Sequence, residues 1–79
     1  MAAARFLDTY DVIEFSIDVD GARRICWISQ EAMEDRFGAS RETAVPLLMQ
    51  NMQAIAPVAE RVARATAPGE TVLVKSEHF

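Results

Sequence analysis

The chain has 79 residues, a formal net charge of -4 at pH 7, and hydrophobic side chains at 51% of its positions. A chain of this length forms one domain with a thin hydrophobic core. The negative charge argues against broad electrostatic binding to nucleic acid or anionic lipid, and the balance of apolar and charged residues excludes a disordered chain.

The cysteine content and the apolar runs bear on where the protein works. Cys26 is the single cysteine, so no disulfide can form within the chain, and a reducing compartment is expected. The apolar runs are too short to span a membrane, and residues 1–5 lack the apolar core of a signal peptide. We therefore expect a cytoplasmic protein without a membrane partner, beginning with a flexible tail over residues 1–9.

Residues 10–28 are predicted to form a β-hairpin. Apolar and polar residues alternate over residues 13–19, which is typical of a strand with one buried face. Asp20-Gly21 follows, and this dipeptide favours a two-residue type I′ turn because both positions then need positive φ. Such a turn fixes the register of the returning strand, in which Phe15 faces Cys26.

The register assigns the side chains of the hairpin to two faces. Arg24 lies on the core face, and we expect its guanidinium to reach water at the sheet margin. The other face should carry an ion pair between Asp18 and Arg23. Ile25 and Trp27 also lie on that nominally wet face, so the tail, the last strand or another chain should cover them. The apolar members of the core face are Ile13, Phe15, Ile17, Val19, Cys26 and Ile28.

Two helices are predicted after the hairpin. Ser29 suits the N-cap of a short helix over residues 29–38, and Gly38 suits the left-handed position that ends it. Ser40 suits the N-cap of a second helix over residues 40–67, in which apolar residues recur at intervals of three and four. Pro57 would either kink this helix or divide it in two. The apolar stripe keeps its phase across Pro57, which favours one long kinked helix.

The last segment with a regular pattern is residues 71–75, which alternate and are rich in β-branched residues, so a third strand is expected there. Together the elements predict one small α+β domain over residues 1–79. It should have two layers, with a short helix and a long kinked helix on one face of a three-stranded, mostly antiparallel sheet. The C-terminal strand lies beside the hairpin.

Two segments resemble parts of a known family: a Cys-x-Ile-Ser step over residues 26–29, and a helix that ends in Phe37-Gly38-Ala39. With the hairpin turn and the last strand, they make the chain similar over about residues 12–79 to a bacterial family of short proteins, domain of unknown function 1488. The resemblance implies a small α+β domain of bacterial origin. It implies no activity and no catalytic residues.

Cys26 and His78 are the only residues that could form a thiol–imidazole pair. A nucleophilic cysteine needs a base or a positive charge that holds it as a thiolate. Cys26 is expected on the core face, where its thiol stays protonated, and His78 is expected in a solvated tail. One histidine and one cysteine also fall short of a four-ligand zinc site. We therefore predict no catalytic, metal-binding or cofactor-binding residues.

Two further groups of residues are candidates for binding. Arginines could gather into a patch for anions or nucleic acid if the long helix ends over the hairpin, although a solvated face paired with nearby carboxylates is the simpler interpretation. Met33, Met49 and Met52 could line an adaptable partner groove, although methionines at helical spacing more commonly fill a core. The members of the arginine patch are Arg23, Arg24, Arg61 and Arg64.

The leading functional hypothesis is a non-enzymatic accessory or interaction module that self-associates. Its partner would be a second copy or an unknown protein, and its surface would include Ile25 and Trp27, because apolar side chains gathered on an exposed face mark an interface. The alternative is a small nucleic-acid-associated regulator that uses the arginine patch. A thiol-dependent enzyme that uses Cys26 comes last.

Overall fold

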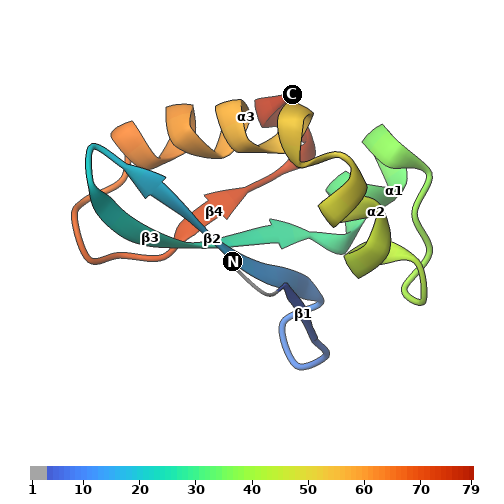
Figure 1. Cartoon of the computed structure of the whole chain (residues 1–79). Helices are drawn as coiled ribbons and strands as arrows, with labels where there is room; N and C mark the ends of the chain where they lie inside the picture. The colour runs from blue at the N-terminus through green and yellow to red at the C-terminus, as the bar shows by residue number, and fades with distance from the viewer. Residues whose placement is uncertain (1–3) are drawn as a thin grey trace.

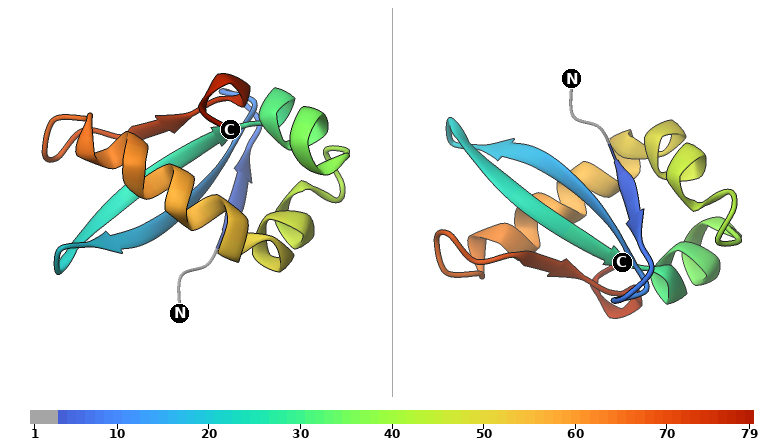
Figure 2. Two further views of the ribbon diagram at one scale, coloured as in Figure 1. Left: turned by 90° about the horizontal axis from the view of Figure 1, so that it is seen from above. Right: turned by 90° about the horizontal axis from the view of Figure 1, so that it is seen from below.

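A computed structural model describes residues 4–79 and, within them, contains a four-stranded sheet and three α-helices (Figure 1). The strands are β1 (Arg5–Leu7), β2 (Val12–Val19), β3 (Ala22–Ser29) and β4 (Val72–Val74). The helices are α1 (Gln30–Phe37), α2 (Ala44–Gln50) and α3 (Met52–Arg64), and a 3-10 turn, η1 (Ser76–His78), follows β4. Helix α3 crosses one face of the sheet, α1 and α2 continue this layer, and no helix covers the other face (Figure 2).

Strands β2 and β3 form the predicted hairpin in the predicted register. Phe15 lies opposite Cys26, and all other pairs follow from this one. Asp20 and Gly21 have φ angles of 53° and 82°, as a type I′ turn requires. The prediction of the core face is confirmed, because Ile17 is half-buried and its other apolar members are buried. These are Ile13, Phe15, Val19, Cys26 and Ile28.

The sheet has one strand more than predicted, in the order β1-β2-β3-β4. Arg5–Leu7 falls within the predicted tail, yet it pairs antiparallel with residues 12–14 of β2. Phe6 anchors this edge strand by packing on the core. Three residues are too few to show an alternating pattern of apolar and polar side chains. They form a strand because they pair with β2, and the sequence alone does not reveal this pairing. The rest of the predicted tail that precedes Ala4 lies outside the described residues.

Strand β4 runs parallel to β3, with Cys26 opposite Val72 and Ile28 opposite Val74. The sheet is therefore mixed: its other two strand pairs are antiparallel, as predicted for most of the sheet, and this third pair is parallel. The direction of β4 follows from the connection, because the three helices between β3 and β4 form a crossover that returns the chain to the end where β3 began.

Helix α1 begins and ends as predicted. The Ser29 hydroxyl accepts a hydrogen bond from the amide of Ala32 at 3.1 Å, which satisfies one free donor of the first turn. Gly38 adopts a left-handed conformation with φ of 65°, and its amide donates to the Glu34 carbonyl at 3.1 Å.

The N-cap predicted at Ser40 is wrong. Residues 40–43 form a turn in which the Ser40 amide donates to the Thr43 hydroxyl at 2.8 Å. Helix α2 starts after this turn, at Ala44. Pro46 then falls in its first turn, where the missing amide would have had no partner in the helix.

The single kinked helix predicted over residues 40–67 is also wrong, because α2 and α3 are separate helices that meet at Asn51. There φ and ψ are -110° and 19°, and the Asn51 side-chain amide donates to the Leu47 carbonyl at 2.8 Å. Pro57 lies inside α3 without ending it. The position of the break is set by the local hydrogen bonding of Asn51, and α2 turns back towards the β1 end of the sheet (Figure 2).

The core lies between α3 and the sheet and extends under α1 and α2. Small residues on α3, Ala59 and Ala63, are buried and let the helix approach the strands closely. The largest of the fully buried side chains are Ile13, Ile28, Met33, Leu48, Ile55, Val72 and Val74.

Replacement of the two prolines should have unequal effects on stability. Pro57 lacks an amide at an interior position of α3, so Pro57→Ala is expected to raise the free energy of unfolding by about 1–3 kcal/mol. Pro46→Ala is the matched control and should change it by less than about 0.5 kcal/mol. Urea unfolding followed by circular dichroism measures both values, and equal effects would contradict the assignment of Pro57 to a helix interior.

Candidate functional site

The face of the sheet without helices carries exposed apolar side chains. Ile25 is 43% exposed and Leu73 is 48% exposed, and Leu73 of β4 lies opposite the half-buried Trp27 of β3. A shallow hollow of about 250 Å³ lies between Tyr10, Trp27 and Leu73. We call these four residues, Tyr10, Ile25, Trp27 and Leu73, the open-face patch.

Trp27 is partly covered by the turn that joins β1 to β2. The ring of Tyr10 lies 4.8 Å from the ring of Trp27, with an interplanar angle of 30°. The indole nitrogen of Trp27 donates a hydrogen bond to Glu14 at 3.0 Å, and Glu14 also pairs with Arg5 at 3.0 Å. The N-terminal segment therefore covers part of Trp27, whereas Ile25 stays open.

The hydrogen bond from Trp27 lowers the pKa of Glu14 below 4.5; partial desolvation opposes the shift, and the nearby Arg5 adds to it. A carboxylate with a lowered pKa in the folded state stabilises the fold above its unfolded pKa, and this contribution is lost as the pH falls through the folded pKa. The contact between Trp27 and Glu14 should therefore persist through neutral and mildly acidic solution.

Trp27 fluorescence tests this contact. We expect its emission to stay constant above pH 4.5 and to change below that value as Glu14 is protonated. Glu14→Gln should abolish the change while leaving the fold intact by circular dichroism. A midpoint at or above pH 4.5 in the wild-type protein would show that the hydrogen bond from Trp27 does not stabilise the carboxylate.

The guanidinium of Arg24 binds groups of the protein, whereas the prediction placed it in water. Its guanidinium donates to the carbonyls of Ala63, Thr66 and Ala67 at 3.3, 3.4 and 3.1 Å, at the end of α3. The carbonyls of Ala63 and Ala67 each also accept a backbone hydrogen bond, from the amides of Thr66 and Glu70. The negative end of the helix dipole favours a cation at this place. Arg24 therefore joins the hairpin to α3 instead of pointing freely to water.

The other arginines of the predicted patch lie near the same end of α3. Arg64 pairs with Asp20 at 3.0 Å and with Glu60 at 2.9 Å, and Arg61 donates to the carbonyl of His78. The predicted ion pair between Asp18 and Arg23 does not form among the described residues. Both side chains stay exposed, where an ion pair gains little over hydration.

A hollow of about 520 Å³ brings three of these arginines together. Arg23, Arg24 and Arg64 line it with Asp20, whereas Arg61 lines a neighbouring hollow beside Arg64. Hydrogen bonds within the chain already occupy two of the three guanidinium groups. Binding of an anion or a nucleic acid at this place stays a prediction.

Cys26 is fully buried, and its thiol lies 3.8 Å from the carbonyl of Arg24. Burial raises the pKa of the thiol to about 11, against a smaller opposing effect of the Arg24 charge. His78 is engaged elsewhere, because its Nδ1 accepts a hydrogen bond from the amide of Lys75 at 2.8 Å. The structure thus does not assemble a thiol–imidazole pair, and residues 4–79 contain no cluster of side chains that could hold a metal ion.

Thiol labelling provides a direct check on Cys26. The rise of its pKa from 9.0 to about 11 lowers the thiolate fraction at pH 8 about a hundredfold, and burial slows the reagent further. Labelling with a maleimide should therefore be slow in the native protein and fast in urea. Rapid labelling without urea would contradict a buried, protonated thiol.

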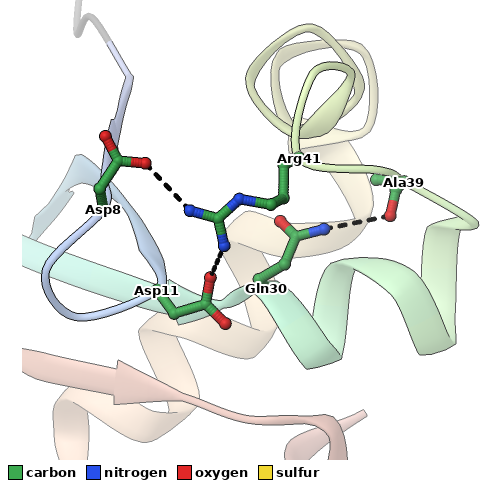
Figure 3. A network of polar contacts seen from close by, with 5 residues as sticks. All are labelled: Asp8, Asp11, Gln30, Ala39 and Arg41. Atoms are coloured by element: carbon green, nitrogen blue, oxygen red, sulfur yellow. Dashed lines mark hydrogen bonds and ion pairs between the residues drawn. The ribbon is translucent and has the colours of Figure 1, made fainter.

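A polar network at the end of the hairpin away from the Asp20-Gly21 turn was not predicted (Figure 3). Arg41, from the turn before α2, donates to Asp8 at 3.0 Å and to Asp11, and its guanidinium lies 4.6 Å above the ring of Phe6. Nearby, the buried Gln30 donates to the carbonyl of Ala39 at 3.2 Å. No periodic pattern relates residues about thirty positions apart, so the sequence gives no signal for this network. The network joins the turn after β1 to the helical layer.

The open sheet face and the helical layer define a small α+β domain with a mixed four-stranded sheet. The chain belongs to the DUF1488 family, described as proteins of unknown function, whose sequence profile matches residues 3–74. This confirms the resemblance seen in the sequence. The family carries no assigned activity.

A solved structure supports the fold. It is the crystal structure of a DUF1488 family protein of unknown function from Shewanella loihica PV-4, with a TM-score of 0.72 and 21% sequence identity. The alignment covers 90% of this chain and 84% of that chain. A comparison with curated proteins found no match. Within residues 4–79, no helix combines the length and the apolar character needed to cross a membrane.

Proposed function

We propose that this protein is a non-enzymatic interaction module that self-associates through the open-face patch. The observation that carries the proposal is the exposure of Ile25 and Leu73 on a sheet face that no helix covers. Exposed apolar side chains that form a contiguous patch on one face mark interaction surfaces. Burial of such side chains contributes roughly 25 cal/mol for each Å² removed from water.

A second copy suits this face because its charges are self-complementary. Asp18 and Arg23 lie on the open face in paired positions, yet they form no ion pair with each other. In a dimer with two-fold symmetry, each could meet the opposite charge of the other copy, since the same patch serves both subunits. Two sheets that pack face to face lie about 10 Å apart, which would bring the Ile25 and Leu73 side chains of the two copies into contact.

The two other functions rank lower on specific grounds. The arginine patch suits a regulator that binds nucleic acid, but the guanidinium groups of Arg24 and Arg64 already bind partners within the chain, and the net charge is -4. A thiol enzyme would need an ionised Cys26, and this thiol is buried. A bacterial, cytoplasmic setting is part of the proposal, supported by the lone cysteine and by the related protein from Shewanella.

The oligomeric state tests the proposal. Sedimentation at high micromolar concentration should show a dimer of the wild-type protein and a monomer of the double variant Ile25→Glu, Leu73→Glu, because each copy would have to bury two charges in the interface. Met49→Glu is the matched control, since Met49 is 41% exposed on the helical layer, and it should remain dimeric. A wild-type monomer at this concentration would refute self-association.

A further inference from the structure

Strand β2 is longer than the strand that covers its outer edge. β1 pairs with residues 12–14 of β2, whereas β3 pairs with the whole of β2. From Ser16 to Asp18, no strand among residues 4–79 lies beside β2 on the β1 side. A strand edge with unpaired backbone groups is a ready template for another strand.

The direction of these backbone groups follows from the hairpin. The carbonyl of Asp11 accepts a hydrogen bond from the amide of Gln30, its partner in the register, at 3.0 Å. Backbone groups alternate in direction along a strand, so odd-numbered residues of β2 bond to β3 and even-numbered residues point away from it. The amides and carbonyls of Ser16 and Asp18 therefore point outward, beyond Glu14, which lies opposite Arg5, the first residue of β1.

An apolar groove runs beside this free edge. It has a volume of about 370 Å³ and lies between β2, at Ser16 to Asp18, and the side chains of Met49, Met52 and Ala56. Met33, the third methionine of the pattern, is fully buried in the core. Met49 and Met52 thus belong to the surface of the groove, where flexible thioether side chains adapt to different partners. We call this free edge together with its hollow the edge groove.

We propose that the edge groove binds an extended segment of another protein, which adds to β2 as an antiparallel strand. Its central motif would be a basic residue, an aliphatic residue and a small polar residue. The edge groove contains none of the four residues of the open-face patch, although Asp18 also takes part in the charge pairing of the proposed dimer. The inference therefore does not depend on self-association. Strand addition of this kind draws affinity from backbone hydrogen bonds and specificity from side-chain pockets.

The motif follows from the register. Side chains of directly opposed residues point to the same face of a sheet, so the residue opposite Ile17 would enter the space between β2 and the methionines. The preceding residue would lie opposite Asp18, whose carboxylate makes no ion pair among the described residues, and a lysine or arginine fits there. Glu60 also lines the groove, where it pairs with Arg64 at 2.9 Å. The following residue would lie opposite Ser16, where a small polar side chain fits.

A second copy of this chain fits the edge groove poorly. Two β2 edges joined antiparallel would place the Asp18 carboxylates of both copies on the same face, near one junction. The free edge is also short, because β1 occupies the edge beside residues 12–14. A peptide segment of about five residues fits this length, whereas a whole domain would have to avoid β1.

The test measures fluorescence anisotropy with a labelled peptide of sequence Ser-Lys-Ile-Thr-Ser flanked by glycines. N-methylation of its lysine and threonine amides, which would face β2, should weaken binding at least about tenfold. N-methylation of the isoleucine amide, which would face away, is the matched control and should leave binding unchanged. Equal effects of the two methylations would overturn strand addition, and so would the absence of binding at millimolar peptide.

A charge exchange tests the motif. Asp18→Lys should weaken the lysine peptide about tenfold and strengthen a glutamate-substituted peptide, whereas Glu34→Lys, an exposed charge reversal on α1, should do neither. Met49→Ser should weaken both peptides. Peptide binding that survives both Asp18→Lys and Met49→Ser would overturn the proposal. So would loss of the dimer in Met49→Ser, and that result would assign the groove to a second copy. Ile25→Glu, Leu73→Glu should bind the lysine peptide normally, which separates this inference from the proposed dimer.

Discussion

The two-residue turn at Asp20-Gly21 is the constraint on which the rest of the structure depends. It sets the register of β2 and β3, and a slip by one residue would exchange the two faces of the hairpin. That register buries Phe15 and Cys26 and leaves Ile25 outside. It also sets which backbone groups of β2 point away from β3. The open-face patch and the edge groove are therefore two consequences of one turn.

The helical layer depends on the same hairpin through Arg24. Its position opposite Ile17 places the guanidinium on the core side of the sheet, beneath the last turn of α3. A half-buried arginine in this position would be unfavourable without partners, and the carbonyls of Ala63, Thr66 and Ala67 at the end of α3 accept its hydrogen bonds. Arg24, which interrupts the alternating pattern, thus makes the contact that joins the hairpin to α3. Helix α3 in turn leads the chain into β4 beside β3.

Local rules predicted what local interactions determine. The alternation of β2, its turn, and the caps of α1 at Ser29 and Gly38 depend on residues within a few positions of one another, and each was predicted correctly. Strand β1, the Arg41 network and the parallel direction of β4 depend on partners far along the chain. The break at Asn51 was missed for a different reason: proline carries a stronger local signal than asparagine, but an exposed Pro57 can be accommodated inside a packed helix. The open-face patch was predicted through Ile25 and Trp27, whereas Tyr10 and Leu73 joined it through tertiary structure.

The small size of the chain explains why two surfaces remain available. Three short helices in a chain of 79 residues can cover one face of the sheet, so the second face keeps apolar side chains that the alternating pattern alone would have made polar. The two surfaces offer different chemistry. The open-face patch presents side chains and discriminates by shape and burial, whereas the edge groove presents backbone groups and discriminates by extended conformation. The two surfaces meet at Asp18, whose carboxylate would pair with Arg23 of the second copy in the dimer and with the basic residue of the peptide in the edge groove.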